Sequence, residues 1–223
     1  MTDSISAEQH SSMANAPDTT AHTSSTADEN ITVFHDRQNY TVKHPLQNTW
    51  TLWFDSPGKK ANIVSWSQNL KEVTSVDAVE DFWGVYNNVV KVDRLDNNSN
   101  YHFFKKGVRP EWEDPENANG GKFSIQFPRN RNADSINNYW LNTILAMIGE
   151  QFTFDDQICG AVVSVRKVFF RIGLWIKTSD NDEIVQSIGK QLKQFLDIPP
   201  NLQVEFAPHG DVPAGAKPNR TVV

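Results

Sequence analysis

Two tryptophans stand in polar segments where a core-filling side chain is not expected. Trp112 lies between two glutamates in a stretch bounded by prolines and followed by a glycine pair, and Trp66 has serine neighbours on both sides. Exposed indole rings can stack on planar ligands. A single loop tryptophan is more often a local packing anchor, so neighbouring groups must support a binding site. Glu113, directly after Trp112, is one such group.

Basic residues are predicted to gather on one side of a β-sheet near Trp112. Alternate residues of a strand face the same side. A predicted hairpin over residues 160–178 therefore places Arg171 and Trp175 on its polar side, with Arg166 at the turn, and Lys122 opens the strand that follows the Trp112 segment. A single arginine on the polar face of a strand is usually only solvated. The clustering of several cations is therefore more informative than any one of them.

The elements that position these residues follow from hydrophobic periodicity. Strands are predicted at residues 48–54, 100–104, 121–128, 160–166, 170–178 and 201–206. Helices are predicted at residues 75–90, 134–150 and 180–196, the first two capped by Ser75 and Asp134. Strands that are apolar on one side only indicate an antiparallel sheet with one face covered by helices. The predicted fold class is α+β.

Charge is distributed unevenly along the 223 residues. The net charge is −6, and the first 30 residues contribute five acids and no base. Residues 1–35 are polar throughout and are predicted to be a disordered acidic tail, followed by one domain over residues 36–223. The nearly neutral domain excludes a broad basic face for polyanions, so phosphate recognition must come from a few well-placed cations.

The cysteine content and the distribution of apolar residues predict the cellular compartment. Cys159 is the single cysteine, which excludes an internal disulfide and suits a reducing environment. No apolar run approaches the ~20 residues of a membrane span, and the start of the chain does not resemble a secretory signal. These features predict a cytoplasmic protein, with a nuclear location also open.

Several long segments resemble the eukaryotic translation initiation factor 4E family, the mRNA cap-binding proteins. The matching segments, in register from His44 onward, are HPLQNTWTLWF, VEDFWGVYNNV, WEDPENANGGK, WLNTILAMIGE and CGAVVSVR. The resemblance implies a curved antiparallel sheet, three long helices packed on its convex face, and a slot for 7-methylguanosine on the concave face. By position, the implied cap-binding residues are Trp66 and Trp112 as the stacking pair, Glu113 on the guanine edge, Lys122, Arg166 and Arg171 on the phosphates, and Trp175 beside the methyl group.

The resemblance also implies a partner groove. The segment YWLNTILAMI is apolar nearly all round, more than one core-facing stripe requires. The implied groove binds a helical motif of an initiation scaffold protein and of competing repressors. Its residues are His44, Pro45, Val79, Trp83, Leu141, Asn142 and Leu145. Asn142 stands where glutamate is common, and from the residues alone Trp83 would more often belong to a core.

The function that follows is recognition of capped mRNA and recruitment of the scaffold to start protein synthesis, by a monomer without enzymatic activity, cofactor or metal. Lys122 and Arg171 keep the charge of the family pattern, in which arginine and lysine are common at these two positions. Three alternatives remain open. They are a hydrolase that uses the carboxylates around Trp112, a tryptophan-rich carbohydrate-binding module, and a family paralogue that binds caps as a translational repressor.

Overall fold

The computed structural model describes residues 30–56, 69–210 and 221–222. The chain divides into two compact units, Met1–Val42 and Lys43–Val223. Most of the predicted disordered tail, residues 1–29, lies outside the described residues, as does the predicted stacking residue Trp66. In the described part of the first unit, the amide of His35 donates to the carbonyl of Thr32 (2.9 Å), so the last residues of the predicted tail form a hydrogen-bonded turn.

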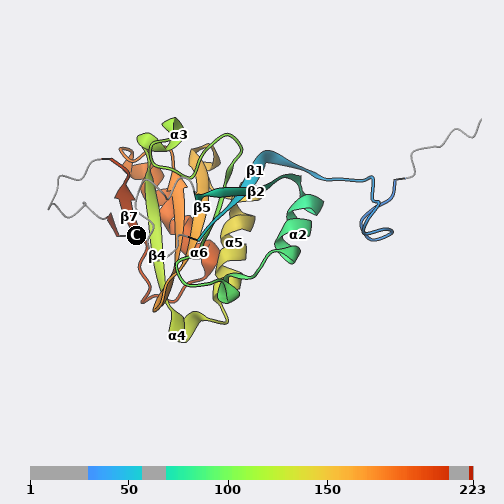
Figure 1. Cartoon of the computed structure of the whole chain (residues 1–223). Coiled ribbons are helices and arrows are strands. Elements are labelled where there is room, and N and C mark those ends of the chain that lie inside the picture. The colour runs from blue at the N-terminus through green and yellow to red at the C-terminus, as the bar shows by residue number, and fades with distance from the viewer. Residues whose placement is uncertain (1–29, 57–68, 211–220, 223) are drawn as a thin grey trace, which may run out of the picture. The chain divides into compact units, whose positions relative to one another are not determined.

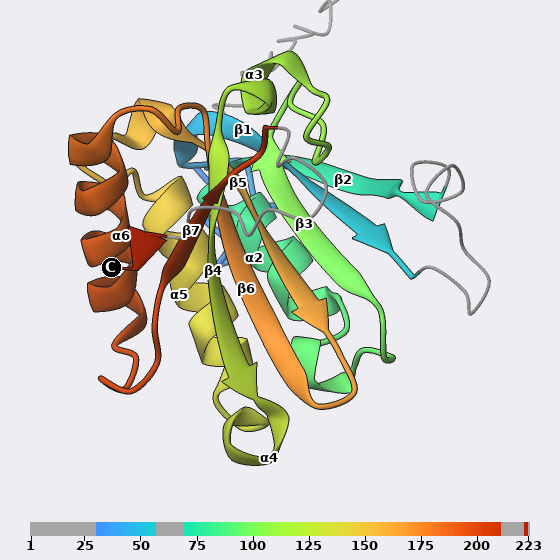
Figure 2. The ribbon, with the colours of Figure 1, turned by 90° about the vertical axis from the view of Figure 1, so that its left-hand side faces the viewer.

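The second unit is built on one curved antiparallel sheet, and Figure 2 shows its strands with the long helices behind and to one side. Every paired strand in the described residues runs antiparallel to its neighbour. The order across the sheet is β2-β1-β3-β5-β6-β4-β7-β8. The strands are β1 Pro45–Asp55, β2 Lys71–Ala78, β3 Asn100–Lys105, β4 Gly121–Pro128, β5 Ile158–Val165, β6 Phe169–Ile176, β7 Glu205–Pro208 and β8 Thr221–Val222.

Three long helices pack on the convex face of this sheet (Figure 1). They are α2 Val79–Asn88, α5 Ile136–Ile148 and α6 Asp182–Leu196. Short helices occupy the connections: α3 Pro115–Ala118, α4 Arg129–Asn132, and the 3₁₀ turns η1 Val92–Arg94 and η2 Asp155–Gln157. None of the described helices is long and apolar enough to cross a membrane.

Strand alternation separates the core from the open face. In β4, Phe123, Ile125 and Phe127 are fully buried, whereas Lys122 and Gln126 are exposed. Strand β6 repeats this arrangement, with its aliphatic residues inside. The apolar side of the sheet and the inner faces of α2, α5 and α6 form one continuous core. The polar side is left open, as the one-sided apolar strands predict.

The predicted helix at residues 75–90 is wrong in its first turn. Ser75 lies in β2, where its hydroxyl is 2.9 Å from the hydroxyl of Thr51 on β1, and α2 begins only at Val79. The segment SVDAVEDF fits a helical period, but Val76 and Ala78 are buried by pairing with β1. Tertiary pairing therefore overrides the local pattern.

Other boundaries also shift. Asp134 does not cap its helix, because α5 starts at Ile136 with Ser135 in the cap position and no side-chain cap hydrogen bond. Asn181 does cap α6, accepting from the amides of Glu183 and Ile184 (3.1 and 3.2 Å). The strand predicted at 201–206 begins only at residue 205, since a turn precedes it. Strands β2 and β8 were not predicted.

Candidate functional site

A pocket of about 230 Å³ opens on the polar face of the sheet, opposite the long helices. Five of the seven predicted ligand-binding residues line it: Trp112, Lys122, Arg166, Arg171 and Trp175. The pocket therefore combines two indole rings with three cationic side chains. Its remaining lining residues are Asn100, His102, Pro110, Glu111, Ser124, Val162, Ser164 and Gly173.

The strand register explains why these side chains meet. Lys122 of β4 pairs with Trp175 of β6, so both project from the same face on adjacent strands. Gly173 lies two residues from Trp175 on the same face of β6, and it has no side chain that could fill the pocket. A Cβ built on Gly173 would meet the carbonyl oxygen of Phe123 at 3.4 Å, an ordinary contact, whereas a longer side chain would project into the pocket.

The loop that carries Trp112 is held by a buried amide. The side chain of Asn117 is fully buried, and its Nδ2 donates to the carbonyls of Arg109 and Glu111, both at 2.8 Å. Asp114 caps the short helix α3, accepting from the amide of Glu116 at 3.0 Å. These bonds fix the backbone on both sides of Trp112, whose side chain stays 50% exposed. Trp112 is thus presented to solvent by an ordered loop.

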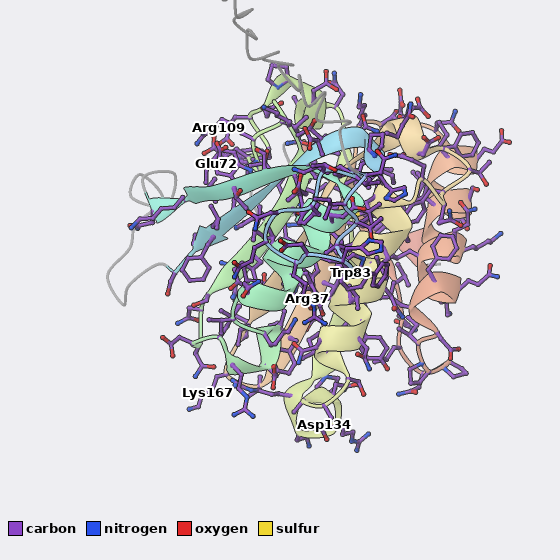
Figure 3. The ribbon with its side chains drawn as sticks, turned by 90° about the vertical axis from the view of Figure 1, so that its right-hand side faces the viewer. Arg37, Glu72, Trp83, Arg109, Asp134 and Lys167 are labelled. Atoms are coloured by element: carbon purple, nitrogen blue, oxygen red, sulfur yellow. The ribbon has the colours of Figure 1, made fainter. Side chains whose placement is uncertain are left out.

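One ion pair braces this loop internally, and another joins it to the end of β6. The guanidinium of Arg109 donates to both carboxylate oxygens of Glu111 (3.2 and 2.9 Å) and lies 5.5 Å from the ring of Trp53. The hydrogen bond to Glu111 raises the pKa of Arg109. Lys177, which follows β6, lies 2.8 Å from Glu116 and lowers the pKa of that carboxyl group by hydrogen bonding. Figure 3 shows Arg109 beside the sheet at the level of this loop.

Glu113 does not line the pocket in this conformation. It is exposed in the turn directly after Trp112, and the lining carboxylate of the loop is Glu111. Glu111 is engaged by Arg109, as described above. Glu113 therefore adjoins the pocket only through its sequence neighbour Trp112, which lines it.

A buried polar cluster positions Arg166. Its Nη2 donates to Oδ1 of Asn100 at 3.0 Å, and its Nη1 donates to the carbonyl of Val165 at 2.9 Å. The Nδ2 of Asn100 donates in turn to both oxygens of the fully buried Asp55 (3.0 and 2.9 Å). Burial and the nearby Arg171 lower the pKa of Arg166, while Asp55 opposes this shift. Arg166 is thus held in place with one carboxylate behind it.

Sequence reasoning missed Asp55, Asn100 and His102. The Nε2 of His102 lies 2.5 Å from Oδ1 of Asp55, so Asp55, Asn100 and His102 are buried together, and the last two line the pocket. The sequence did contain a signal for Asn100 and His102, because these two polar residues alternate with apolar ones in the strand predicted at residues 100–104. Only the pairing of β1 with β3 brings Asp55 opposite Asn100.

Trp175 is supported from two sides. Its ring makes an edge contact with the buried Phe104, with the centroids 5.5 Å apart, and lies 4.2 Å from the ring of His209. Burial, with a smaller effect of nearby Lys122, lowers the pKa of His209 to about 4. The imidazole is therefore neutral at pH 7 and adds no cation to this wall. His209 lies beyond the last predicted strand and was not predicted to contribute.

The predicted partner residues lie on the other side of the domain. The amide of Val79 donates to the carbonyl of His44 at 2.9 Å, and Pro45 pairs with the buried Ala78. The exposed His44, Pro45 and Val79 therefore meet at the start of α2. Val79 and Trp83 are 38% and 37% exposed. Figure 3, which views the helix-covered side, labels Trp83 on it. Trp83 is therefore not a core residue.

Helix α5 contributes the rest of the predicted groove. Leu141 and Leu145 are half-buried and pack against the core, while Asn142 is exposed. The amide of Asn142 lies 3.5 Å from the carbonyl of Phe195 on α6, a long and weak hydrogen bond. An apolar strip with partly exposed leucines suits a helical partner better than an enzymatic cleft.

The described residues contain no group of three or more His, Cys, Asp or Glu residues that could hold a metal ion. Burial raises the pKa of the Cys159 thiol to about 12, so this thiol is not a nucleophile at neutral pH. An indole surface beside three cations suits a planar, positively charged ring attached to a phosphate chain.

Comparison with known proteins shows the family of this chain. The family model described as eukaryotic initiation factor 4E matches residues 45–221. Curated relatives include eukaryotic translation initiation factor 4E-1 of Triticum aestivum, 47% identical over 154 residues that cover 69% of this chain and 70% of the relative. The allele A protein of Solanum tuberosum is 46% identical over 170 residues, covering 76% of this chain and 72% of the relative.

Solved structures are similar over most of the chain. Ascaris suum eIF4E-3 in complex with an m2,2,7G cap has a TM-score of 0.75 and 36% identity, covering 82% of this chain and 99% of that one. The Caenorhabditis elegans eIF4E-3 complex with the 4E-binding protein Mextli and a cap analog has a TM-score of 0.73 and 36% identity, covering 82% and 100%. From the family model, the sequence identities and the shared fold, the chain belongs to the eukaryotic initiation factor 4E family.

Proposed function

We propose that this chain binds the 7-methylguanosine cap of mRNA in the open-face pocket and recruits the translation initiation scaffold. The observation that carries the proposal is the pocket itself, in which Trp112 and Trp175 meet Lys122, Arg166 and Arg171. Methylation at N7 gives guanine a delocalised positive charge. An indole then gains stacking and cation–π attraction of ~0.5–2 kcal/mol over unmethylated guanine. The solved cap complexes of the two nematode relatives support the same assignment.

The base is proposed to lie between Trp112 and Trp66. Trp112 is held outward by its ordered loop, which supports its role as one platform. Trp66 lies outside the described residues, so its role rests on its place in the sequence. Glu113 is proposed to accept two hydrogen bonds from guanine N1–H and the exocyclic amine, a pair that adenine does not offer. Trp175 is proposed to contact the methyl group.

The phosphate chain is proposed to run along Arg166, Arg171 and Lys122. Arg166 uses one Nη2 hydrogen on Asn100 and one Nη1 hydrogen on Val165, which leaves further N–H donors for phosphate oxygens. In the described residues, the buried Nε of Arg171 has no hydrogen-bond partner. Buried donors are nearly always paired, so an anionic ligand is the expected partner.

The helix-covered side is proposed to bind a helical motif of the scaffold or of competing repressors. Partly exposed Val79, Trp83, Leu141 and Leu145 supply the apolar contacts. Asn142 offers a neutral side chain where glutamate is common in the family, so a partner would lose one charged contact at this position. The C. elegans relative solved with the 4E-binding protein Mextli supports this role. The protein is proposed to promote translation, with a role as a translational repressor as the alternative. It is proposed to act in the cytoplasm, as a monomer and without enzymatic activity.

Tryptophan fluorescence provides the direct test. Titration with 7-methyl-GTP should quench the emission and saturate. GTP should bind more weakly by about 2- to 30-fold for each stacking indole, because only the methylated base carries the positive charge. Incubation with capped RNA should leave the cap intact. Equal affinity for the two nucleotides would refute the stacking site, and release of the cap would indicate an enzyme.

A further inference from the structure

A buried carboxylate lies behind the pocket without reaching it. Asp55 of β1 is fully buried, so its carboxylate cannot contact a ligand in the pocket. It pairs across the sheet with Asn100 of β3, which lines the pocket. Burying a carboxylate costs free energy unless its oxygens are hydrogen-bonded. Any effect of Asp55 on binding must pass through the residues that face the ligand.

Two residues of β3 hold the Asp55 carboxylate. Nδ2 of Asn100 donates to both of its oxygens, at 3.0 and 2.9 Å, and Nε2 of His102 lies 2.5 Å from Oδ1. An ionised carboxylate only accepts hydrogen bonds, so Nε2 of His102 carries a hydrogen in this arrangement. The carboxylate therefore has a fixed orientation toward β3, with donors on both oxygens.

The direction of the Asn100 side-chain amide follows from these contacts. Its NH₂ group only donates and its oxygen only accepts. With the NH₂ group on Asp55, the oxygen faces Arg166 and accepts from its Nη2 at 3.0 Å. A reversed amide would place a donor against the donor-only guanidinium and an acceptor against the carboxylate. Asp55 therefore selects the one amide orientation that can hold Arg166.

The same carboxylate balances charge in the pocket wall. One row of paired residues crosses β1, β3, β5 and β6, and it consists of Asp55, Asn100, Ser164 and Arg171. Arg166 follows β5 and lines the pocket together with Arg171. Burial and the nearby Arg171 lower the pKa of Arg166, and Asp55 acts in the opposite direction. Two neighbouring guanidinium groups repel each other, and the charge of Asp55 offsets part of that repulsion.

We propose that Asp55 is a positioning residue for phosphate recognition, acting on Arg166 through the amide of Asn100. The inference rests on the proposed function, because the position of Arg166 matters only if it binds the phosphates of the cap. A guanidinium that is already held in place loses less conformational freedom when the ligand binds. Removing Asp55 should therefore weaken the part of the affinity that the phosphates supply and leave the part that the base supplies unchanged.

Calorimetric titrations with 7-methylguanosine and 7-methyl-GTP separate these two parts. The ratio of the two affinities measures the contribution of the phosphates. Asp55→Ala should lower this ratio about fivefold or more, the equivalent of one net hydrogen bond, while 7-methylguanosine binds as it does to the wild type. Asp55→Asn keeps an acceptor oxygen for Asn100 and loses only the charge, so its ratio should lie between those of the wild type and Asp55→Ala.

Two further variants test whether the effect passes through Arg166. Arg166→Met lowers the ratio by itself, and adding Asp55→Ala to it should lower the ratio no further. Asp93→Ala is the matched control, because Asp93 also accepts from an asparagine amide, that of Asn137 at 2.7 Å, but lies outside the pocket. This control should keep the wild-type ratio.

The outcomes separate the role of Asp55 from the proposed function. A wild-type ratio in folded Asp55→Ala, an equal loss of affinity for both ligands, or a further fall in the Arg166→Met background overturns the role of Asp55. If Asp55→Ala does not fold, Asp55→Asn decides, and a wild-type ratio in that variant overturns the role. Failure of the wild-type chain to bind 7-methyl-GTP overturns the proposed function and this inference together.

Discussion

Replacing Trp112 with alanine should weaken cap binding without weakening the fold. The side chain is 50% exposed, and the bonds that hold its loop come from Asn117 and Asp114, so the truncation removes little core packing. A stacked aromatic contributes ~1–3 kcal/mol. With about 1.4 kcal/mol for each tenfold change, the dissociation constant for 7-methyl-GTP should rise about 5- to 150-fold. Fluorescence titration measures this, with Trp175 remaining as a reporter in the pocket.

Trp83→Ala is the matched control, because it removes a tryptophan of similar exposure, 37%, from the opposite side of the domain. It should bind 7-methyl-GTP as the wild type does and lose affinity for a scaffold peptide. Thermal melts should show both variants folded. If Trp112→Ala keeps wild-type affinity while folded, Trp112 is not a stacking platform. If Trp83→Ala loses the nucleotide and the peptide together, Trp83 supports the core instead of a partner.

Three further predictions concern the pocket floor, the loop and the start of α2. Gly173→Leu should abolish 7-methyl-GTP binding in a calorimetric titration by filling the pocket, whereas Gly173→Ala should retain it, since a Cβ meets nothing closer than 3.4 Å. Asn117→Ala should lower the free energy of unfolding by about 1–3 kcal/mol in urea, because it loses two 2.8 Å hydrogen bonds, one to Arg109; unchanged stability would contradict the role of this amide. Hydrogen bonds from His44 lower the pKa of Glu80 from 4.5 to about 2, so this pair stabilises the fold above pH 4.5 and is lost as the pH falls toward 2. Glu80→Gln should therefore flatten the acid side of a melting-temperature profile, and an unchanged profile would exclude this pair as its cause.

Local patterns were sufficient wherever one face of an element is apolar. Strand β4 has the predicted bounds, residues 121–128, because apolar and polar residues alternate without exception along it. Helix α6 begins two residues after its predicted start and ends at the predicted residue, with Asn181 as its cap. These elements agree with their propensities, so the isolated sequence already specifies them.

Local sequence patterns predicted the wrong secondary structure where a segment fits a helix and a strand equally well. Residues 75–78 suit a helical period and also a strand, and only the partner strand β1 decides between them. The point at which β7 begins is likewise decided by a distant segment, because β7 forms its hydrogen bonds with β4. A period counted along one segment carries no information about which segment will lie beside it.

The sequence by itself determined the family, the α+β class and the alternation that points Lys122, Arg171 and Trp175 to the open face. The tertiary structure alone decided which distant residues support the site: Asp55 and Asn100 behind Arg166, and His209 beside Trp175. The physical reason is that alternation depends on neighbours in the chain, whereas buried polar contacts depend on strand order, which brings together residues tens of positions apart.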